Sequence, residues 1–173
     1  MAGKGPIFIL SVDGGGSRGV IPANVLYHIE HDAGVPVRET FDFFAGVSTG
    51  AMVAAHVARD AGTMEMLAKH SYSSDNLSRI MDKSIWDRML GRMQNQPKYD
   101  GENKRHYVDS LAQGARINDI KDKHLLILAY DFINRELVTF KNNRGHDASY
   151  NPCLTEICDA ATAAPTLYPT VPT

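Results

Sequence analysis

The sequence lacks the features that mark several classes of protein. No stretch approaches the ~18 consecutive apolar residues of a membrane-spanning helix, and the apolar run at residues 7–12 is too short for a secretory signal peptide. The two cysteines, Cys153 and Cys158, lie close together on one expected helix and point in different directions, so we expect no disulfide. The formal net charge of −2 provides no electrostatic basis for binding nucleic acid. We therefore expect a cytoplasmic protein with no nucleic-acid partner.

The composition that is present is ordinary for one folded domain. Hydrophobic residues make up 43% of the sequence and charged residues 22%. A chain of 173 residues is long enough to bury a sizeable core. It shows no internal repeat, low-complexity tract or convincing linker, so we expect a single domain over residues 1–173.

The first half of the chain alternates expected strands and helices. Residues 6–12 are apolar and partly β-branched, which predicts a buried strand, and the helix after them has an apolar face of Val25, Leu26 and Ile29. Residues 41–47 predict a second strand, and the helix that follows is apolar on nearly all sides, which indicates burial. Strand–helix–strand–helix with short links predicts an α/β fold, in which helices flank a mainly parallel central sheet on both faces.

The second half is expected to complete this domain. The predicted elements are a methionine-rich helical segment (63–92), a polar loop (94–103), a short helix (107–111), two strands that pair across a turn (125–131 and 136–140), and a helix (154–161) stopped by Pro165.

A Gly-x-Ser-x-Gly motif lies between the second strand and its helix. Such a turn is so tight that side chains two residues on either side of the serine would collide, and Gly46 and Gly50 remove them. Ser48 would then be held in a strained conformation with its hydroxyl exposed, facing the positive end of the helix dipole. The spacing predicts a nucleophilic serine, with a structural turn as the alternative.

A glycine-rich loop at residues 14–19 satisfies Gly-x-Gly-x-x-Gly between a strand and a helix. Dinucleotide binding would need an acidic residue at the end of the second strand, but Glu39 precedes that strand. A phosphate-binding P-loop would need Gly-Lys-Ser/Thr, which is absent. The third possibility is an oxyanion hole built from uncovered backbone N–H groups, with Arg18 adding positive charge. We favour the oxyanion hole over nucleotide binding, and a simple tight turn remains as an alternative.

The two motifs together resemble those of the patatin-like phospholipases. The resemblance rests on Asp-Gly-Gly-Gly-x-Arg-Gly at residues 13–19, followed by Gly-x-Ser-x-Gly at residues 46–50. Residues 98–101, 128–131 and 160–166 are similar to further segments that recur in that family. The likeness therefore extends along most of the chain and implies a three-layer α/β domain of the patatin-like kind.

The resemblance also implies a chemistry. Ser48 would be the nucleophile, and Gly14, Gly15, Gly16 and Arg18 would form the oxyanion hole. The substrate would be an acyl lipid, either a phospholipid or a galactolipid, and the protein would make transient peripheral contact with a membrane surface. No cofactor and no metal ion is implied.

One element of the family pattern is not found. In patatin-like enzymes an aspartate in Asp-Gly-Gly or Asp-Gly-Ala, some way beyond the segment resembled by residues 160–166, takes the serine proton. The Asp-Gly pairs here are Asp13-Gly14 and Asp100-Gly101, and neither is in that place. We therefore expect either the N-terminal portion of a longer protein or a domain that has lost its base and serves lipid binding or regulation.

Two further expectations concern other residues. A Ser-His-Asp esterase is a rival, because Ser48, Asp131 and His146 have the required order, although such folds place more strands before the serine. His56 lies inside the apolar helix and is expected to be a buried, hydrogen-bonded histidine rather than a base.

The methionine-rich segment has two interpretations. Met64, Met81 and Trp86 could line a groove for an acyl chain, because unbranched thioether side chains fit irregular apolar shapes. Ordinary helix packing is the alternative that we favour.

Overall fold

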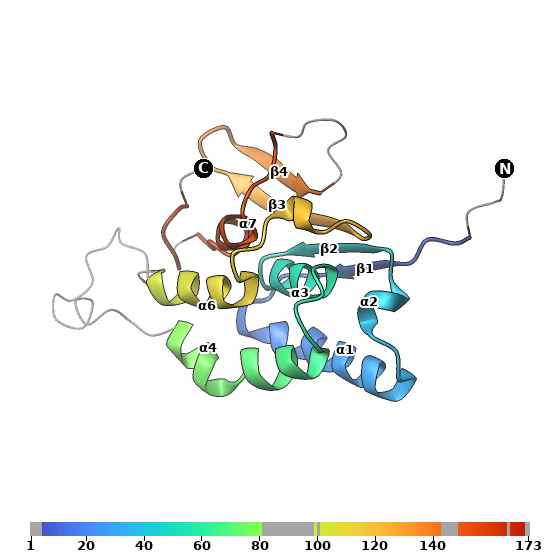
Figure 1. The fold of residues 1–173 in the computed structure, drawn as a ribbon. Coiled ribbons are helices and arrows are strands. Elements are labelled where there is room, and N and C mark those ends of the chain that lie inside the picture. The colour runs from blue at the N-terminus through green and yellow to red at the C-terminus, as the bar shows by residue number, and fades with distance from the viewer. Residues whose placement is uncertain (1–4, 81–98, 100, 143–148, 166, 172–173) are drawn as a thin grey trace.

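The computed structural model describes residues 5–80, 99, 101–142, 149–165 and 167–171. Its sheet has the order β1-β2-β3-β4, with strands at Ile9–Val12, Phe43–Val47, His124–Asp131 and Glu136–Lys141. The first three strands are parallel, with Leu10 opposite Phe44 and Gly46 opposite Ile127, and β4 returns antiparallel to β3 (Figure 1). This arrangement confirms the predicted α/β class with a mainly parallel sheet.

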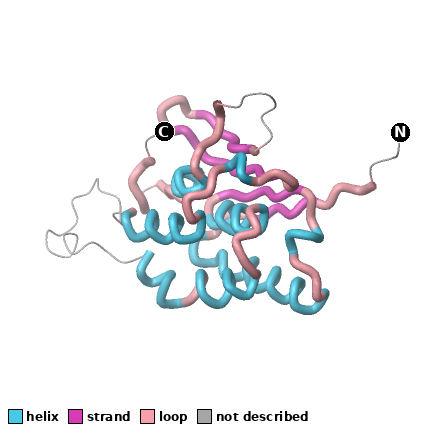
Figure 2. The backbone as a smooth tube through the Cα atoms, in the orientation of Figure 1, coloured by secondary structure: helices cyan, strands magenta, loops and turns pink. Residues whose placement is uncertain are grey.

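Helices flank the sheet (Figure 2). They are η1 (Gly16–Gly19), α1 (Val20–Ala33), α2 (Val37–Thr40), α3 (Thr49–Ala58), η2 (Met66–Ser71), α4 (Ser74–Ile80), α6 (Glu102–Ala112), η3 (Ile117–Asp119) and α7 (Leu154–Ala161). Within the described ranges, none of these helices combines the length and the apolar character needed to cross a bilayer.

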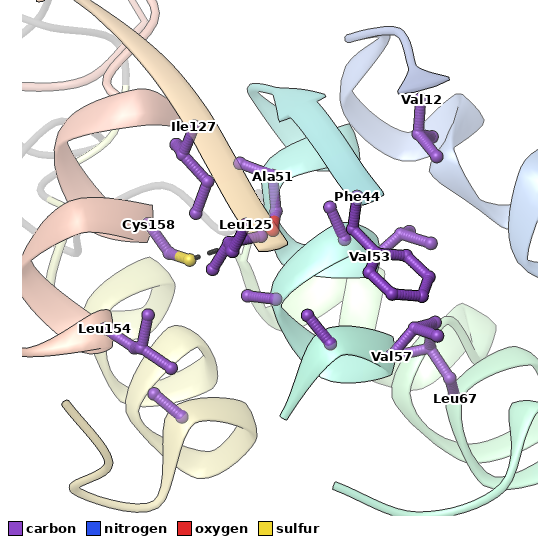
Figure 3. Close-up of a cluster of buried hydrophobic side chains, with 14 of the residues drawn as sticks. Val12, Phe44, Ala51, Val53, Val57, Leu67, Leu125, Ile127, Leu154 and Cys158 are labelled. Atoms are coloured by element: carbon purple, nitrogen blue, oxygen red, sulfur yellow. Dashed lines mark hydrogen bonds between the residues drawn. The ribbon is translucent and has the colours of Figure 1, made fainter. Parts of the chain in front are cut away.

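The core is built around α3. This helix packs against β1, β2 and β3 on one side and against α6 and α7 on others, which explains why its sequence is apolar on nearly all sides. Figure 3 shows Val53 and Val57 of α3 near Phe44 on one side, with Leu125, Ile127, Leu154 and Cys158 across the helix. The predicted buried helix after Ser48 is thus confirmed, and it fixes the start of α3 at the carboxyl end of β2.

His56 lies in this core, as expected for a buried histidine. Its Nε2 is 3.2 Å from the carbonyl oxygen of Gly62, whereas its Nδ1 has no hydrogen-bond partner in the described part of the chain. Burial is the main cause that lowers the pKa of His56, since the charged ring would have to leave water.

The amino-terminal strand and helix are less buried than predicted. Ile9 of β1 is 62% exposed and Leu10 is half-buried, and on α1 only Leu26 of the predicted apolar face is buried, while Val25 is 52% exposed and Ile29 is also exposed. The prediction that residues 6–12 form a fully buried strand is therefore wrong for this structure. The physical reason is position, because β1 is an edge strand among the described residues.

Two helix predictions also change at their boundaries. The short helix expected at residues 107–111 begins at Glu102, directly after Gly101, and ends at Ala112. The expected helical segment 63–92 contains a π-helix (η2) followed by α4, and its remainder from residue 81, with Met81 and Trp86, lies outside the described residues.

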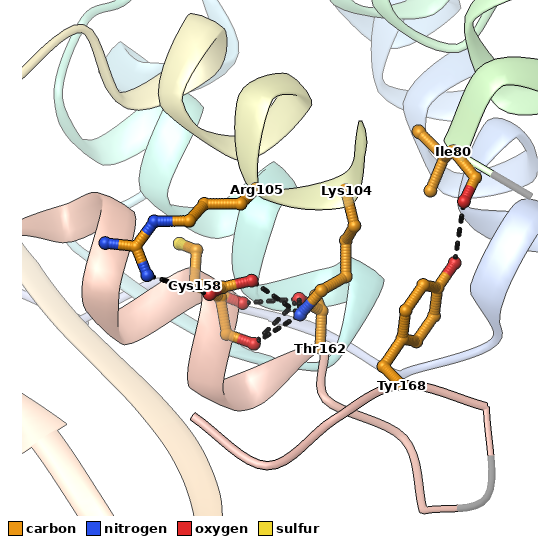
Figure 4. Close-up of polar contacts among 7 residues, drawn as sticks. Ile80, Lys104, Arg105, Cys158, Thr162 and Tyr168 are labelled. Atoms are coloured by element: carbon orange, nitrogen blue, oxygen red, sulfur yellow. Dashed lines mark hydrogen bonds and ion pairs between the residues drawn. The ribbon is translucent and has the colours of Figure 1, made fainter. Parts of the chain in front are cut away.

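A buried ion pair joins α6 to α7. The Nζ atom of Lys104 donates to the carbonyl oxygen of Asp159 at 2.8 Å and to Thr162 Oγ1 at 3.3 Å (Figure 4). It also lies 2.6 Å from Asp159 Oδ1, a charge contact whose geometry is poor for a hydrogen bond. The two side chains are only 6% and 5% exposed, and desolvation, the largest effect, lowers the pKa of Lys104. This pair holds the start of α6 against the end of α7.

Candidate active site

The turn between β2 and α3 holds Ser48 in a strained conformation. Its backbone has φ 54° and ψ −126°, a left-handed region that residues other than glycine rarely adopt. Ser48 is half-buried and occupies the position before the first turn of α3, where its carbonyl oxygen accepts the N–H of Ala51 at 2.9 Å. The serine therefore lies at the carboxyl edge of the sheet and at the positive end of a helix dipole.

The glycines on either side of Ser48 are required by close backbone contacts. A Cβ atom on Gly46 would overlap the carbonyl oxygen of Gly50, and a Cβ atom on Gly50 would overlap the carbonyl oxygen of Val12. The turn is thus packed both on itself and on the end of β1. No larger residue fits either position unless the backbone moves.

The glycine-rich loop lies directly against Ser48. A Cβ atom on Gly14 would be 2.9 Å from Ser48 Cβ and 3.7 Å from Ser48 Oγ. The N–H groups of Gly14, Gly15 and Gly16 donate no hydrogen bond to any described residue, and Gly16 has a positive φ of 58°. Unused donors beside a serine hydroxyl are the arrangement that an oxyanion hole needs.

Arg18 lies on the same loop. Its backbone N–H donates to the carbonyl oxygen of Gly15 at 3.2 Å, and its side-chain Nε donates to the same oxygen at 3.4 Å. The guanidinium is therefore held beside Gly15 while its side chain remains exposed. This position places a permanent positive charge near the unused amides.

A groove opens beside the loop, between β1 and α1. It has a volume of about 410 Å³ and is lined mostly by apolar side chains, among them Leu10, Ile21, Val25 and Ile29. Residues 13–15 form part of its wall. We call it the β1–α1 groove.

A family model described as patatin-like phospholipase matches residues 10–173, so it covers both the elbow at Ser48 and the glycine loop. The chain belongs to the patatin-like phospholipase family.

Known proteins of the family are similar over nearly the whole chain. Patatin-like protein 2 of Oryza sativa subsp. indica is 30% identical over 184 residues, which cover 94% of this chain and 44% of that protein. The cGAMP-activated phospholipase of Pseudomonas aeruginosa is 27% identical over 172 residues, covering 98% of this chain and 50% of that protein. The chain thus spans about half the length of the curated relatives that it matches.

The fold agrees with a solved structure. The crystal structure of the type III effector protein ExoU matches with a TM-score of 0.54 at 14% identity, covering 95% of this chain and 40% of that one. At this identity the match supports the patatin-like fold and nothing finer.

Two other candidate residues of this patatin-like chain, Met64 and Asp131, have contacts of their own. Met64 is 2% exposed and packs in the core, in keeping with the helix-packing alternative. The carboxylate of Asp131 accepts hydrogen bonds from both nitrogens of Asn134 and from the N–H of Ile133, the last at 2.8 Å. These hydrogen bonds lower the pKa of Asp131 and hold its carboxylate in the β3–β4 turn. His146 lies outside the described residues. Across the described ranges, no cluster of histidine, cysteine and acidic side chains is suited to hold a metal ion.

Sequence reasoning missed a buried hydrogen bond next to the elbow. The hydroxyls of Thr49 and Tyr72 are 2.7 Å apart, and Tyr72 also donates to the carbonyl oxygen of Thr49 at 3.3 Å. A Cβ atom on Gly19 would overlap the Thr49 hydroxyl and lie 2.7 Å from the Tyr72 ring. Burial raises the pKa of Tyr72 to about 12, so its hydroxyl stays protonated at neutral pH. The contact joins the glycine loop, the elbow and the residue after η2, and no motif around Tyr72 pointed to it.

Proposed function

We propose that the chain is the nucleophile-bearing part of a lipid acyl hydrolase, with Ser48 as the nucleophile. The observation that supports this most strongly is the contact of Gly14 with Ser48, which sets unused backbone amides beside a strained serine. Membership of the patatin-like phospholipase family, with a phospholipase among its relatives, supports an acyl lipid such as a phospholipid as substrate. Contact with the membrane surface would be transient.

The proposed reaction proceeds through an acyl-enzyme. The Ser48 hydroxyl oxygen bonds to the ester carbonyl carbon while a base takes its proton, and the resulting oxyanion accepts hydrogen bonds from the N–H groups of Gly15 and Gly16. Arg18 adds positive charge beside that oxyanion. The carbon–oxygen bond to the alcohol then breaks, and the alcohol leaves with the proton. Water attacks the acyl group next, and its departure as a carboxylic acid restores the hydroxyl of Ser48.

A second candidate is a lipid-binding or regulatory domain with little activity. One observation favours it: within the described ranges, no side chain makes a hydrogen bond to Ser48 Oγ. The two candidates differ in whether Ser48 reacts with an electrophile.

Labelling with a fluorophosphonate probe distinguishes these candidates, because the probe bonds to an activated serine. We expect labelling at Ser48, its loss in Ser48→Ala, and its retention in the control Ser110→Ala, which changes an exposed serine on α6. Absence of labelling, together with binding to phosphatidylcholine vesicles, would favour the regulatory domain. Labelling that disappears in His146→Ala would instead favour a Ser-His-Asp esterase.

A further inference from the structure

The turn between β3 and β4 carries two adjacent apolar side chains in water. Ile133 is 91% exposed, more than any other large apolar side chain in the described part of the chain, and Phe132 is 49% exposed. Turns are usually occupied by glycine, proline and small polar residues. Apolar side chains gathered at an exposed position mark a contact with a lipid surface or with another protein. We call Phe132 and Ile133 the hairpin tip.

The turn holds the hairpin tip in one conformation. The carboxylate of Asp131 accepts hydrogen bonds from the N–H of Ile133 at 2.8 Å and from the side-chain nitrogen of Asn134 at 2.7 Å. The ring of Phe132 packs edge to face against Tyr130, with the ring centroids 5.1 Å apart. A preorganised turn loses little conformational entropy when it meets a ligand. The two apolar side chains are therefore presented to solvent on a fixed backbone.

The hairpin tip projects from the edge of the sheet that bears Ser48. The strands β2 and β3 are parallel, with Val47 opposite Leu128, and Ser48 follows Val47 directly. β3 continues through residues 129–131 before the turn at its carboxyl end (Figure 1). At about 3.3 Å per residue, these residues carry the turn about 10 Å beyond the level of Ser48. A surface that touches the hairpin tip therefore lies on the same side of the sheet as the candidate nucleophile.

The charges and the size of the tip indicate what kind of surface it meets. Asp131 and Glu136 are acidic and Arg135 is basic, so the turn has no positive excess to attract anionic lipid. Arg135 is exposed and makes no hydrogen bond or ion pair to any described residue, so its guanidinium is free to donate to a phosphate. Two side chains are too few for a stable protein interface, which buries about 800 Å² on each partner. Hydrocarbon, in contrast, needs no complementary shape.

We propose that the hairpin tip inserts into the surface of a zwitterionic phospholipid bilayer and thereby places the Ser48 edge of the sheet against the membrane. This inference rests on the proposed function, because a bilayer is where an acyl-lipid substrate is held. Charged side chains on both sides of the tip keep the insertion shallow. The contact is therefore reversible.

The test measures the partition of the chain onto phosphatidylcholine vesicles by flotation, with Ser48→Ala in every protein so that no lipid is hydrolysed. Ile133→Ser should weaken partition by about tenfold or more, because burial of a large apolar side chain contributes at least that factor. Phe132→Ser should weaken it in the same direction. The matched control is Ile7→Ser, which changes an isoleucine that is 66% exposed at the amino end of β1 and should leave partition unchanged.

A second measurement locates the tip in the bilayer. Ile133→Trp adds a fluorescent reporter to a chain whose single natural tryptophan is Trp86. Phosphatidylcholine brominated on its acyl chains should quench the added fluorescence, because the new side chain reaches the hydrocarbon. Partition of the unchanged tip should vary little with added sodium chloride, since apolar insertion is not screened by salt.

Three results would overturn the proposal. The first is equal partition of Ile133→Ser and the protein with an unchanged tip, or no partition of either. The second is binding confined to phosphatidylserine vesicles and lost in salt, which would assign the contact to charge. The third is a dimer that Ile133→Ser dissociates, which would assign the tip to a second copy of the chain.

Failure of this proposal is distinguishable from failure of the proposed function. Fluorophosphonate labelling of Ser48 without vesicles tests the nucleophile alone, and Ile133→Ser should not change its rate. Tip-dependent partition without labelling would support docking and reject the hydrolase. Labelling without tip-dependent partition would support the hydrolase and reject docking.

Discussion

The glycine loop beside Ser48 and the contact between α6 and α7 use polar groups in opposite ways. In the loop, the N–H groups of Gly14, Gly15 and Gly16 find no acceptor among the described residues, and the adjoining serine has a strained backbone. Between α6 and α7, the Lys104 ammonium contacts Asp159 and Thr162 and is almost entirely buried (Figure 4). Backbone strain costs stability and is found mainly at functional sites, whereas N–H groups on exposed residues such as Gly14 and Gly16 can bind water until a ligand replaces it.

The two regions have different roles. Paired and buried charges hold two helices in one arrangement, and their removal should affect unfolding. Unpaired amides at a sheet edge contribute little to the folded state, and their displacement should affect reaction at Ser48. Substitutions at the ion pair should therefore change stability, and substitutions in the glycine loop should change the reactivity of Ser48.

Asp159→Ala should have the largest effect on stability. It leaves the Lys104 ammonium buried without its counter-ion, which lowers the free energy of unfolding by about 3–5 kcal/mol. Urea denaturation followed by circular dichroism measures the change. The matched control is Glu65→Ala, which breaks an exposed pair with Lys69 on one helical turn and should change stability little. Similar losses of unfolding free energy in the two variants would mean that burial does not increase the contribution of the α6–α7 ion pair to stability.

A double variant sharpens this prediction. Replacing Lys104 with methionine and Asp159 with leucine removes both charges while keeping apolar volume. It should recover most of the lost stability, because a buried ion pair contributes little beyond a well-packed apolar pair. A double variant as unstable as Asp159→Ala would instead indicate that the hydrogen bonds of Lys104 to the end of α7 are essential.

Gly14→Ala tests the other half of the comparison. The added methyl group would lie 2.9 Å from Ser48 Cβ, so the loop must move away from the serine. A displacement of this size should slow fluorophosphonate labelling of Ser48 by about a hundredfold, because oxyanion donors act only over a narrow range of positions. Gly5→Ala is the control, since nothing lies within 4 Å of its added methyl group. Unchanged labelling in Gly14→Ala would argue against an oxyanion hole in this loop.

The parts of this fold that could be predicted from sequence are those governed by local pattern. Local pattern alone indicates a strand at residues 43–47, a tight turn at the two glycines of the elbow and a buried helix at α3. The structure has these elements where the pattern predicts them. The helix from Leu154 to Ala161 also buries the predicted face, with Leu154, Ile157 and Cys158 inside.

The parts that could not be predicted depend on neighbours distant in sequence. The composition of β1 indicates a covered strand, but exposure depends on which strands lie beside it. Tyr72 follows a serine and precedes two more, and nothing in that polar stretch indicates that its hydroxyl reaches Thr49. Lys104 belongs to a polar helix, and its partner Asp159 is 55 residues away.

His56 should make stability depend on pH. Burial lowers the pKa of His56 in the folded state below its ordinary value, so the unfolded chain binds a proton first as the pH falls. The stabilisation is therefore complete above about pH 6.5 and declines below it, by at most about 1.4 kcal/mol per pH unit. His56→Gln should flatten the stability profile between pH 7.5 and 5, whereas His70→Gln, at an exposed position, should not. Parallel profiles for His56→Gln and the unchanged protein would show that His56 does not cause the pH dependence of stability.

Tyr72→Phe should have the smallest effect on stability, and it tests whether a hydrogen bond next to the elbow affects the reaction at Ser48 as well as the fold. It removes the hydroxyl that contacts both the hydroxyl and the carbonyl oxygen of Thr49, and it should lower the free energy of unfolding by about 1–2 kcal/mol, at about 1 kcal/mol for each hydrogen bond. Tyr107→Phe is the matched control, because it removes one hydrogen bond to the nearby carbonyl oxygen of Ser71, at 2.9 Å, and should destabilise by a similar amount.

The two variants should differ in the rate at which Ser48 reacts with the fluorophosphonate probe. Thr49 is the next residue after Ser48, and its hydroxyl is packed against Gly19 at the end of the glycine loop, so release of Thr49 loosens the loop against the elbow. Fluorophosphonate labelling of Ser48 should therefore slow in Tyr72→Phe and not in Tyr107→Phe. Equal labelling rates would mean that Tyr72 only stabilises the fold, because a general loss of stability would affect both variants alike.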